Sequence, residues 1–333
     1  MKRPALLQVL LTALIALVSY AAFRLFVMSY EDFRTQKYHH LSKRSVLVAP
    51  PLPDSLTFAG EPVPLDLFDV REALDHELTF NRENFAVTLL IIKRANRYKK
   101  TMTDILKEQG LPSDFFYLMI AESAARSAAT SPAGAKGYWQ FLPETAREFG
   151  LQVDAYVDER KDPVKSTYAA CKYLKRAYAR FKNWHIVAGS YNMGMAGINE
   201  VVQFQGITDY HHLHLNPETG RYIYRILAFK LLLENPEKYG YKIYPGDLYE
   251  PIPSKSVVVN KAIPNLVTFA RENGTTYKMI RLLNPWILKS SLLQPAPNKS
   301  YVIQIPQQYA YKVKPGMPIE GAKESANDLI DTE

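Results

Sequence analysis

The 333-residue sequence has a single cysteine, Cys171, so no disulfide bond can form within the chain. Cys171 lies in the segment STYAACKYLKRAYARF, where apolar and aromatic residues recur at helical spacing. We therefore predict that it is a small residue of a helical core rather than a reactive thiol.

The sequence also lacks concentrated runs of lysine and arginine. Its net charge is +8 and its isoelectric point is about 9.2, but the basic residues are spread along the chain. No nucleic-acid-binding motif is present, so nucleic acid is not an expected partner. A diffuse positive charge instead favours contact with other polyanions.

Alternation of apolar and polar residues, which is typical of strands, is scarce before Val257. Apolar residues instead recur at helical spacing from Leu74 to Ile92, and Asp162-Pro163 and Pro217 are typical helix starts. The sequence therefore predicts a mainly α-helical domain over residues 65–250.

A membrane anchor is predicted for residues 1–28. Lys2 and Arg3 precede an apolar run from Ala5 to Phe23, which is long enough to cross a bilayer core of about 30 Å. A cleaved signal peptide is the alternative, with Ser19-Tyr20-Ala21 as its candidate cleavage site. Both interpretations export the rest of the chain.

Residues 29–64 are polar and then proline-rich, which predicts an extended stalk between the anchor and the folded part. The prolines are Pro50, Pro51, Pro53, Pro62 and Pro64. At the other end, residues 309–333 form a polar tail that is predicted to be disordered.

The most informative stretch runs from Leu111 to Thr145. From Phe115 to Ala121 every residue is apolar or aromatic, so this helix, which Ser113 can cap, is predicted to lie inside the core. Glu122 follows at the end of the helix. A carboxyl group carried out of an apolar helix is poorly solvated, which raises its pKa and suits a proton donor near neutral pH. A structural ion pair at Glu122 is the alternative.

Four segments together resemble the catalytic motifs of family 1 lytic transglycosylases. They are Glu122-Ser123, SPAGA at 131–135, GYWQ at 137–140 and SYNMG at 190–194. The segment from Tyr156 to Pro163 is similar to the Asp-x-Arg-x-Asp segment of the membrane-bound lytic murein transglycosylase D type. The resemblance covers residues 65–244, more than half of the chain.

The resemblance implies a lysozyme-like catalytic domain that cleaves peptidoglycan, the polymer of the bacterial cell wall. Glu122 would protonate the oxygen between N-acetylmuramic acid and N-acetylglucosamine, and would then take the proton from the 6-hydroxyl of the muramic acid. That hydroxyl would close onto C1 and leave a 1,6-anhydro end, with no water consumed and no cofactor required.

The resemblance also assigns substrate-binding residues. Ser131 and Gln140 would hydrogen-bond the sugar near the scissile bond. Tyr191 would lie close to Glu122 and orient it. Asn192 would support that loop, and Tyr222 would line the cleft. Structural roles remain open for the last three, as a cap for the asparagine and as core residues for the tyrosines.

Three residues or segments near these motifs are interpreted differently. Trp139 is predicted to pack in the core. The segment ARS at 125–127 stands where relatives often have a Phe-Asn-Pro turn, and MGMA at 193–196 replaces Ala-Gly-x-Gly. Because both segments lie on the cleft wall in the family, a different subsite preference is predicted.

The triplet His211, His212 and His214 suggests a metal site at first sight. No acidic residue accompanies it at metal-ligand spacing, and the same loop of relatives carries residues that are not ligands. We therefore expect neither a metal nor another cofactor.

Residues 251–308 resemble a LysM carbohydrate-binding module. They predict a small α+β domain with the order strand, helix, helix, strand (βααβ), between a strand at 256–259 and a strand at 301–305. The turns at 263–265 and 295–298 lack the glycine that LysM modules carry there. Glycan binding and a purely structural role therefore both remain open.

Two alternatives to a lytic transglycosylase remain. A muramidase similar to goose-type lysozymes would use water and a second carboxylate, for which Asp154, Asp158 and Glu200 are candidates. The other is a catalytically idle protein that binds peptidoglycan. The expected partners are glycan strands and, through the N-terminal segment, a membrane. The expected location is the inner membrane of a bacterium, with the catalytic domain in the periplasm.

Overall fold

The computed structural model describes residues 18–20, 22–24, 48–244 and 246–307. The chain divides into two compact units, residues 1–49 and residues 50–333. Most of the predicted anchor and the predicted tail lie outside the described residues. Within the described residues, none of the helices has both the length and the apolar character needed to cross a membrane.

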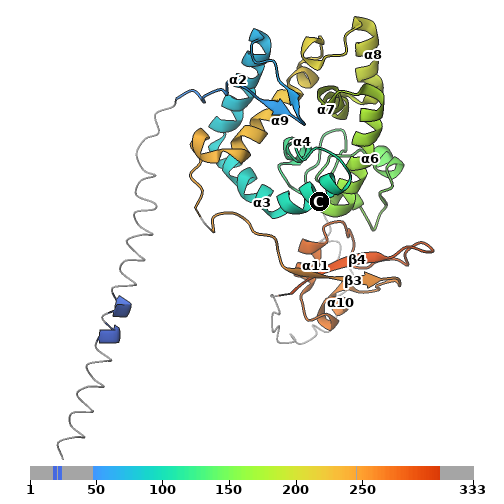
Figure 1. Cartoon of the computed structure of the whole chain (residues 1–333). Helices are drawn as coiled ribbons and strands as arrows, with labels where there is room; N and C mark the ends of the chain where they lie inside the picture. The colour runs from blue at the N-terminus through green and yellow to red at the C-terminus, as the bar shows by residue number, and fades with distance from the viewer. Residues whose placement is uncertain (1–17, 21, 25–47, 245, 308–333) are drawn as a thin grey trace, which may run out of the picture. The chain divides into compact units, whose positions relative to one another are not determined.

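The second unit is helical over most of its length before residue 250 (Figure 1). The helices are α2 (Phe68–Glu83), α3 (Phe85–Glu108), α4 (Phe115–Ser123), α5 (Pro143–Glu148), α6 (Pro163–Phe181), α7 (Trp184–Met193), α8 (Met195–Gln205) and α9 (Pro217–Glu234). Short 3-10 helices, η2 (Glu159–Lys161), η3 (Tyr210–His212) and η4 (Pro236–Tyr239), lie in the connections. The predicted mainly α-helical fold is confirmed for this part of the chain.

Helix α4 lies among the other helices, as its apolar sequence predicts (Figure 1). Every residue from Phe115 to Ile120 is buried, and α4 packs against α3 and α9. The predicted cap from Ser113 does not form, because Asp114 occupies the N-cap position without making a side-chain cap. The Asp114 carboxylate instead accepts hydrogen bonds from Ala59 N at 2.8 Å and Lys230 Nζ at 2.7 Å.

The starts of α6 and α9 are confirmed. Asp162 accepts hydrogen bonds from the first free N–H groups of α6, and Asn216 does the same for α9. A proline holds the first position of each helix, where it has no hydrogen bond to lose. Helix α9 packs against α2, α4 and α7, so its side chains reach three neighbouring helices.

The second half of the predicted stalk is folded against the helices. Strands β1 (Thr57–Phe58) and β2 (Glu61–Pro62) form a short antiparallel hairpin. Phe58 is fully buried, and its ring centroid lies 5.2 Å from that of Phe115 in α4.

The hairpin also caps a helix. The Glu61 carboxylate accepts hydrogen bonds from the N–H groups of Trp184 and His185, which are the first residues of α7. The stalk prediction is therefore wrong for residues 52–64. Proline content indicates an extended and stiff segment, but such a segment can still pack against a core.

Residues 254–306 form the predicted βααβ unit. Its elements are β3 (Ser254–Val259), α10 (Leu266–Glu272), α11 (Tyr277–Leu283) and β4 (Tyr301–Pro306). The two strands pair antiparallel, with Ser254 opposite Pro306 and Val259 opposite Tyr301. Buried residues of this unit, which we call the C-terminal module, form their own apolar cluster, separate from the cluster of the helices.

Replacement of Phe58 by alanine tests whether the hairpin belongs to the folded domain. Phe58→Ala should lower the free energy of unfolding by about 3–5 kcal/mol, because it removes a fully buried ring. The matched control is Phe80→Ala in α2, where the ring is 61% exposed. Chemical denaturation of both variants measures the difference, and equal stabilities would restore the stalk interpretation.

Candidate active site

Glu122 lies in the last turn of α4 and is partly exposed, whereas the residues before Ala121 are buried. Directly after Ser123, Ala124 and Ala125 have φ angles of +52° and +57°. Two consecutive non-glycine residues in the left-handed region are uncommon and cost conformational energy. They end the helix sharply beyond Glu122, so this carboxyl group stands at the edge of the core.

The pKa of Glu122 is raised from 4.5 to about 7. The largest cause is desolvation, because the surrounding protein replaces water around the carboxylate. The nearby Glu218 carboxylate raises the pKa further, while a hydrogen bond from Tyr222 and the positive charge of Arg225 lower it. Glu122 can therefore both release and accept a proton near neutral pH.

The Tyr222 hydroxyl donates a hydrogen bond to Oε1 of Glu122. Tyr222 lies on α9 and is buried. Burial and the neighbouring Glu122 raise the pKa of the phenol well above its usual value, so it stays protonated and acts as a donor. Because Tyr222 bonds Oε1, the second oxygen of the carboxyl group remains for a ligand.

Arg225 has a second carboxylate neighbour, Glu77 of α2. Arg225 Nε donates to Glu77 Oε2 at 3.2 Å, and Arg221 Nε lies 3.9 Å from Glu77 Oε1. Glu77 is buried, so it needs this positive partner. The ion pair with Glu77 holds the Arg225 side chain in place on α9, one helical turn beyond Tyr222.

The 131–141 loop begins with a tight turn closed by Ser131. The Ser131 N–H donates to the Ala135 carbonyl at 2.9 Å, and the Ala135 N–H donates to Ser131 Oγ at 3.1 Å. This second bond uses a lone pair of the serine oxygen and leaves its O–H proton for another partner. Ser131 is partly exposed, so a ligand can reach it.

Gln140 holds the other end of this loop. Its Nε2 donates to the carbonyls of Ala129 at 3.0 Å and Gly137 at 2.9 Å, which uses both amide protons. Gln140 has a φ angle of +48°, a conformation that is uncommon outside glycine. The amide of Gln140 therefore shapes the loop and presents its carbonyl oxygen as an acceptor.

The structure assigns the contact with Glu122 to Tyr222 and not to Tyr191. The Tyr191 hydroxyl donates to the backbone carbonyl of Trp139 at 2.8 Å. The Tyr191 ring packs edge-on against Tyr173, with centroids 5.0 Å apart. Burial raises the pKa of Tyr191 well above its usual value, and the Glu122 charge raises it further. The hydroxyl of this phenol thus holds the loop and not the carboxyl group.

Asn192 joins the end of α7 to the start of α9. Its Oδ1 accepts a hydrogen bond from Thr219 Oγ1 at 2.8 Å, and its Nδ2 lies 3.4 Å from Glu218 Oε1 as a donor. Glu218 is one of the groups that raise the pKa of Glu122. Asn192 thus helps to place a charge that acts on the candidate catalytic carboxyl group.

Residues 103–213 match the family model of the transglycosylase SLT domain. We call residues 103–213 the SLT domain. Residues 255–309 match a second model, the soluble lytic transglycosylase C-terminal LysM-like domain. The predicted family resemblance is therefore confirmed for both parts of the chain.

Comparison with curated proteins gives the membrane-bound lytic murein transglycosylase D of two Escherichia coli strains, K12 and O6:H1. Each is 32% identical over 159 residues, which is 46% of this chain and 35% of the relative. The chain thus spans about a third of the length of these relatives. Among solved structures, an inactive variant of lytic transglycosylase Slt from Pseudomonas aeruginosa covers 46% of this chain and 26% of that chain, with 21% identity and a TM-score of 0.34.

His211 and His212 of the sequence triplet have different partners. His211 is buried and its Nε2 lies 2.8 Å from Nδ1 of His185, whereas His212 is exposed and bonds Asp209. Burial lowers the pKa of both His185 and His211 to about 4, so they form a neutral pair in the core. Across the described residues, no group of three or more potential metal ligands is found.

The candidates for a second catalytic carboxylate have other partners. Asp158 is buried, and both of its oxygens accept hydrogen bonds from Arg160. Asp154 closes a turn by accepting from the N–H groups two and three residues later. Glu200 is exposed on α8. In the part of the chain that the structure describes, no hydrogen bond connects any of these carboxylates to Glu122.

Sequence reasoning missed Arg225, Glu77 and Glu218. Tyr222 and Arg225 are three residues apart on one helix, so they lie on the same face of it. This spacing was the signal in the sequence that pointed to Arg225. The partner Glu77 lies about 150 residues away in the sequence, and nothing local connects it to the site. Trp139, by contrast, packs as predicted: it is fully buried, and its Nε1 donates to Thr167 Oγ1 at 3.0 Å.

Replacement of Tyr222 by phenylalanine tests the hydrogen bond to Glu122. The bond stabilises the carboxylate, so Tyr222→Phe should raise the Glu122 pKa above 7 by about 1 to 2 units. Carbon-13 NMR titration of the glutamate carboxyl groups measures the shift. Tyr191→Phe is the control, because its hydroxyl bonds Trp139, and an equal shift in both variants would contradict the assignment.

Proposed function

We propose that this chain is a peptidoglycan lytic transglycosylase. It cleaves the β-1,4 bond between N-acetylmuramic acid and N-acetylglucosamine without water and leaves a 1,6-anhydro end. The observation that carries the proposal is the Glu122 carboxyl group, which stands at the edge of the core of an SLT domain with a pKa of about 7. The names of the E. coli relatives support the same reaction class.

In the first step Glu122 acts as a general acid. Its Oε1 is hydrogen-bonded by Tyr222, so the proton resides on Oε2 and passes to the bridging oxygen of the glycan. The bond from that oxygen to C1 of the muramic acid breaks, and the N-acetylglucosamine leaves as an alcohol. The new carboxylate is stabilised by the Tyr222 hydrogen bond and by the charge of Arg225.

In the second step the same carboxylate acts as a base. It removes the proton from the 6-hydroxyl of the muramic acid, and the oxygen forms a bond to C1. An internal hydroxyl has a high effective concentration at C1, so one carboxyl group is sufficient for both steps. The Glu122 proton is restored at the end of the cycle. A pKa near neutrality lets the group serve in both roles.

The remaining residues bind or position the sugar. The Ser131 hydroxyl has a free proton and the Gln140 amide a free carbonyl, so together they offer one donor and one acceptor to the glycan. Tyr191 holds the loop through the Trp139 carbonyl. Asn192 holds α7 against α9 through Thr219.

We also propose that residues 1–28 anchor the chain in the inner membrane, so that the SLT domain acts in the periplasm. The apolar run from Ala5 to Phe23 after Lys2 and Arg3 supports this location. The net charge of +8 supports an electrostatic attraction to the anionic cell wall.

Replacement of Glu122 by glutamine tests the reaction. Glu122→Gln should reduce the release of 1,6-anhydro products by at least about 100-fold, because the amide can neither donate nor accept the proton at neutral pH. Mass spectrometry of digested peptidoglycan distinguishes anhydro ends from reducing ends. Glu200→Gln is the matched control on the exposed face of α8. Anhydro ends from the Glu122 variant, or reducing ends from the wild type, would refute the proposal.

The pH dependence of the reaction follows from the raised pKa of Glu122. The free enzyme must hold the proton before it can donate it, so kcat/KM should fall tenfold per pH unit above about pH 7. A soluble glycan of defined length gives this profile without interference from the charge of whole cell walls. A fall in kcat/KM that already begins near pH 4.5, the pKa of an ordinary glutamate, would show that the carboxyl group is not desolvated in solution.

A further inference from the structure

The C-terminal module is joined to the SLT domain by a short backbone ladder. Residues 156–160, which we call the junction segment, run beside residues 286–288 of the module. Val157 pairs antiparallel with Ile287. On either side, the Asp158 N–H donates to the Trp286 carbonyl at 2.9 Å and the Leu288 N–H donates to the Tyr156 carbonyl at 2.8 Å.

The side chain of Val157 belongs to the core of the module. It is fully buried and clusters with module residues such as Ile287 and Ile303, although it lies in the SLT domain by sequence. The module therefore completes its own core with a residue from its neighbour. A contact of this kind is expected of parts that fold together and not of a module on a flexible tether.

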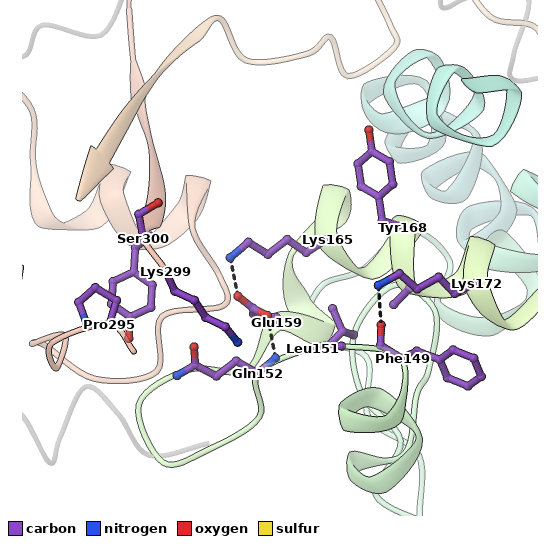
Figure 2. A pocket seen from close by; sticks show the side chains of 13 residues that line it. Phe149, Leu151, Gln152, Glu159, Lys165, Tyr168, Lys172, Pro295, Lys299 and Ser300 are labelled. Atoms are coloured by element: carbon purple, nitrogen blue, oxygen red, sulfur yellow. Dashed lines mark hydrogen bonds and ion pairs between the residues drawn. The ribbon is translucent and has the colours of Figure 1, made fainter. Parts of the chain in front are cut away.

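A pocket of about 320 Å³ opens at the same junction (Figure 2). Glu159 of the junction segment accepts hydrogen bonds there from Lys165 Nζ and from the Gln152 N–H. The ammonium group of Lys165 also lies 5.4 Å from the centroid of the Trp286 ring in the module. The junction segment is thus held from the SLT side as well as from the module.

Arg160 connects the junction segment to the 131–141 loop. It is almost fully buried, and its Nε and one terminal nitrogen bond the two oxygens of Asp158 at 2.8 and 2.7 Å. The other terminal nitrogen donates to the carbonyls of Gly134 at 3.1 Å and Phe141 at 3.0 Å. One planar guanidinium group therefore fixes two carbonyls near opposite ends of the loop.

The backbone of Arg160 also touches the loop. A Cβ atom added to Gly137 would lie 1.9 Å from the Arg160 carbonyl oxygen, so the two chains pass in direct contact. Gly137 has a φ angle of +78° and accepts a hydrogen bond from Gln140. The loop that presents Ser131 and Gln140 is thus shaped against the junction segment.

We propose that the C-terminal module is a structural brace of the active site, and that Arg160 is the positioning residue through which it acts on the 131–141 loop. The module fixes Asp158, the carboxylate of Asp158 orients the Arg160 guanidinium, and the guanidinium holds the loop carbonyls. This proposal rests on the proposed function only for the statement that the loop binds glycan.

The variants Arg160→Lys and Ile287→Ala test the two ends of this path. Lysine keeps the positive charge but cannot hold a carboxylate and two carbonyls in one plane. Ile287→Ala removes part of the apolar cluster of the module that holds the Val157 side chain. Both should accelerate hydrogen exchange at the N–H groups of the 131–141 loop, while the exchange of α9 stays unchanged.

Both variants should also lower kcat by about tenfold or more for release of anhydro ends, because misplaced binding groups slow a reaction that depends on orientation. The controls are Arg147→Lys, which changes the two hydrogen bonds from the exposed Arg147 to the Val153 carbonyl, and Leu282→Ala, which shortens an exposed side chain of α11 outside the apolar cluster that holds Val157. Neither control should change the loop exchange or kcat.

Unchanged loop exchange in Arg160→Lys would overturn the positioning role, and unchanged loop exchange in Ile287→Ala would overturn the brace. A variant with a lowered melting temperature but a normal kcat in its folded fraction would also overturn the proposal. The exchange measurement needs no substrate, so it decides this point even where the wild type releases no anhydro products.

Discussion

Burial of one carboxyl group at the end of an apolar helix is the constraint on which the rest of the structure depends. Helix α4 has no polar face before Glu122, so it must be covered on all sides, and α3 and α9 cover it. The same coverage removes water from the carboxyl group and raises its pKa to about 7. One feature of the sequence thus sets both the position of α4 and the chemistry at its end.

Side chains of helix α9 limit how far desolvation raises the pKa of Glu122. Desolvation alone would favour a permanently protonated acid, which could not act as a base. The Tyr222 hydrogen bond and the Arg225 charge act in the opposite direction and keep the pKa near neutrality. Arg225 is itself held by the buried Glu77 of α2, so the balance at Glu122 depends on helices that are far apart in the sequence.

The sequence predicted the parts of the structure that depend on local patterns. These include the buried helix ending at Glu122, the starts of α6 and α9, and the βααβ order of the module. It did not predict contacts between distant segments. The sequence led us to expect Tyr191 against Glu122, whereas Tyr222 makes this contact in the structure. Helix packing decides which of the two phenols faces the carboxyl group. The prolines of residues 50–64 indicated an extended chain but carried no information about the core that receives Phe58.

The Asp158–Arg160 pair illustrates why a buried ion pair is retained at a position where apolar side chains could fill the space. Apolar residues would pack equally well, but they do not fix the direction of a backbone carbonyl. A planar guanidinium does so for Gly134 and Phe141 at once, because its donors have fixed angles. The cost of desolvating the pair is offset by the two hydrogen bonds between its opposite charges. The backbone of Asp158 is in turn fixed by the Trp286 carbonyl. In the proposed function this loop presents Ser131 and Gln140 to a sugar, and under the proposed brace its shape depends on a module that need not touch the sugar.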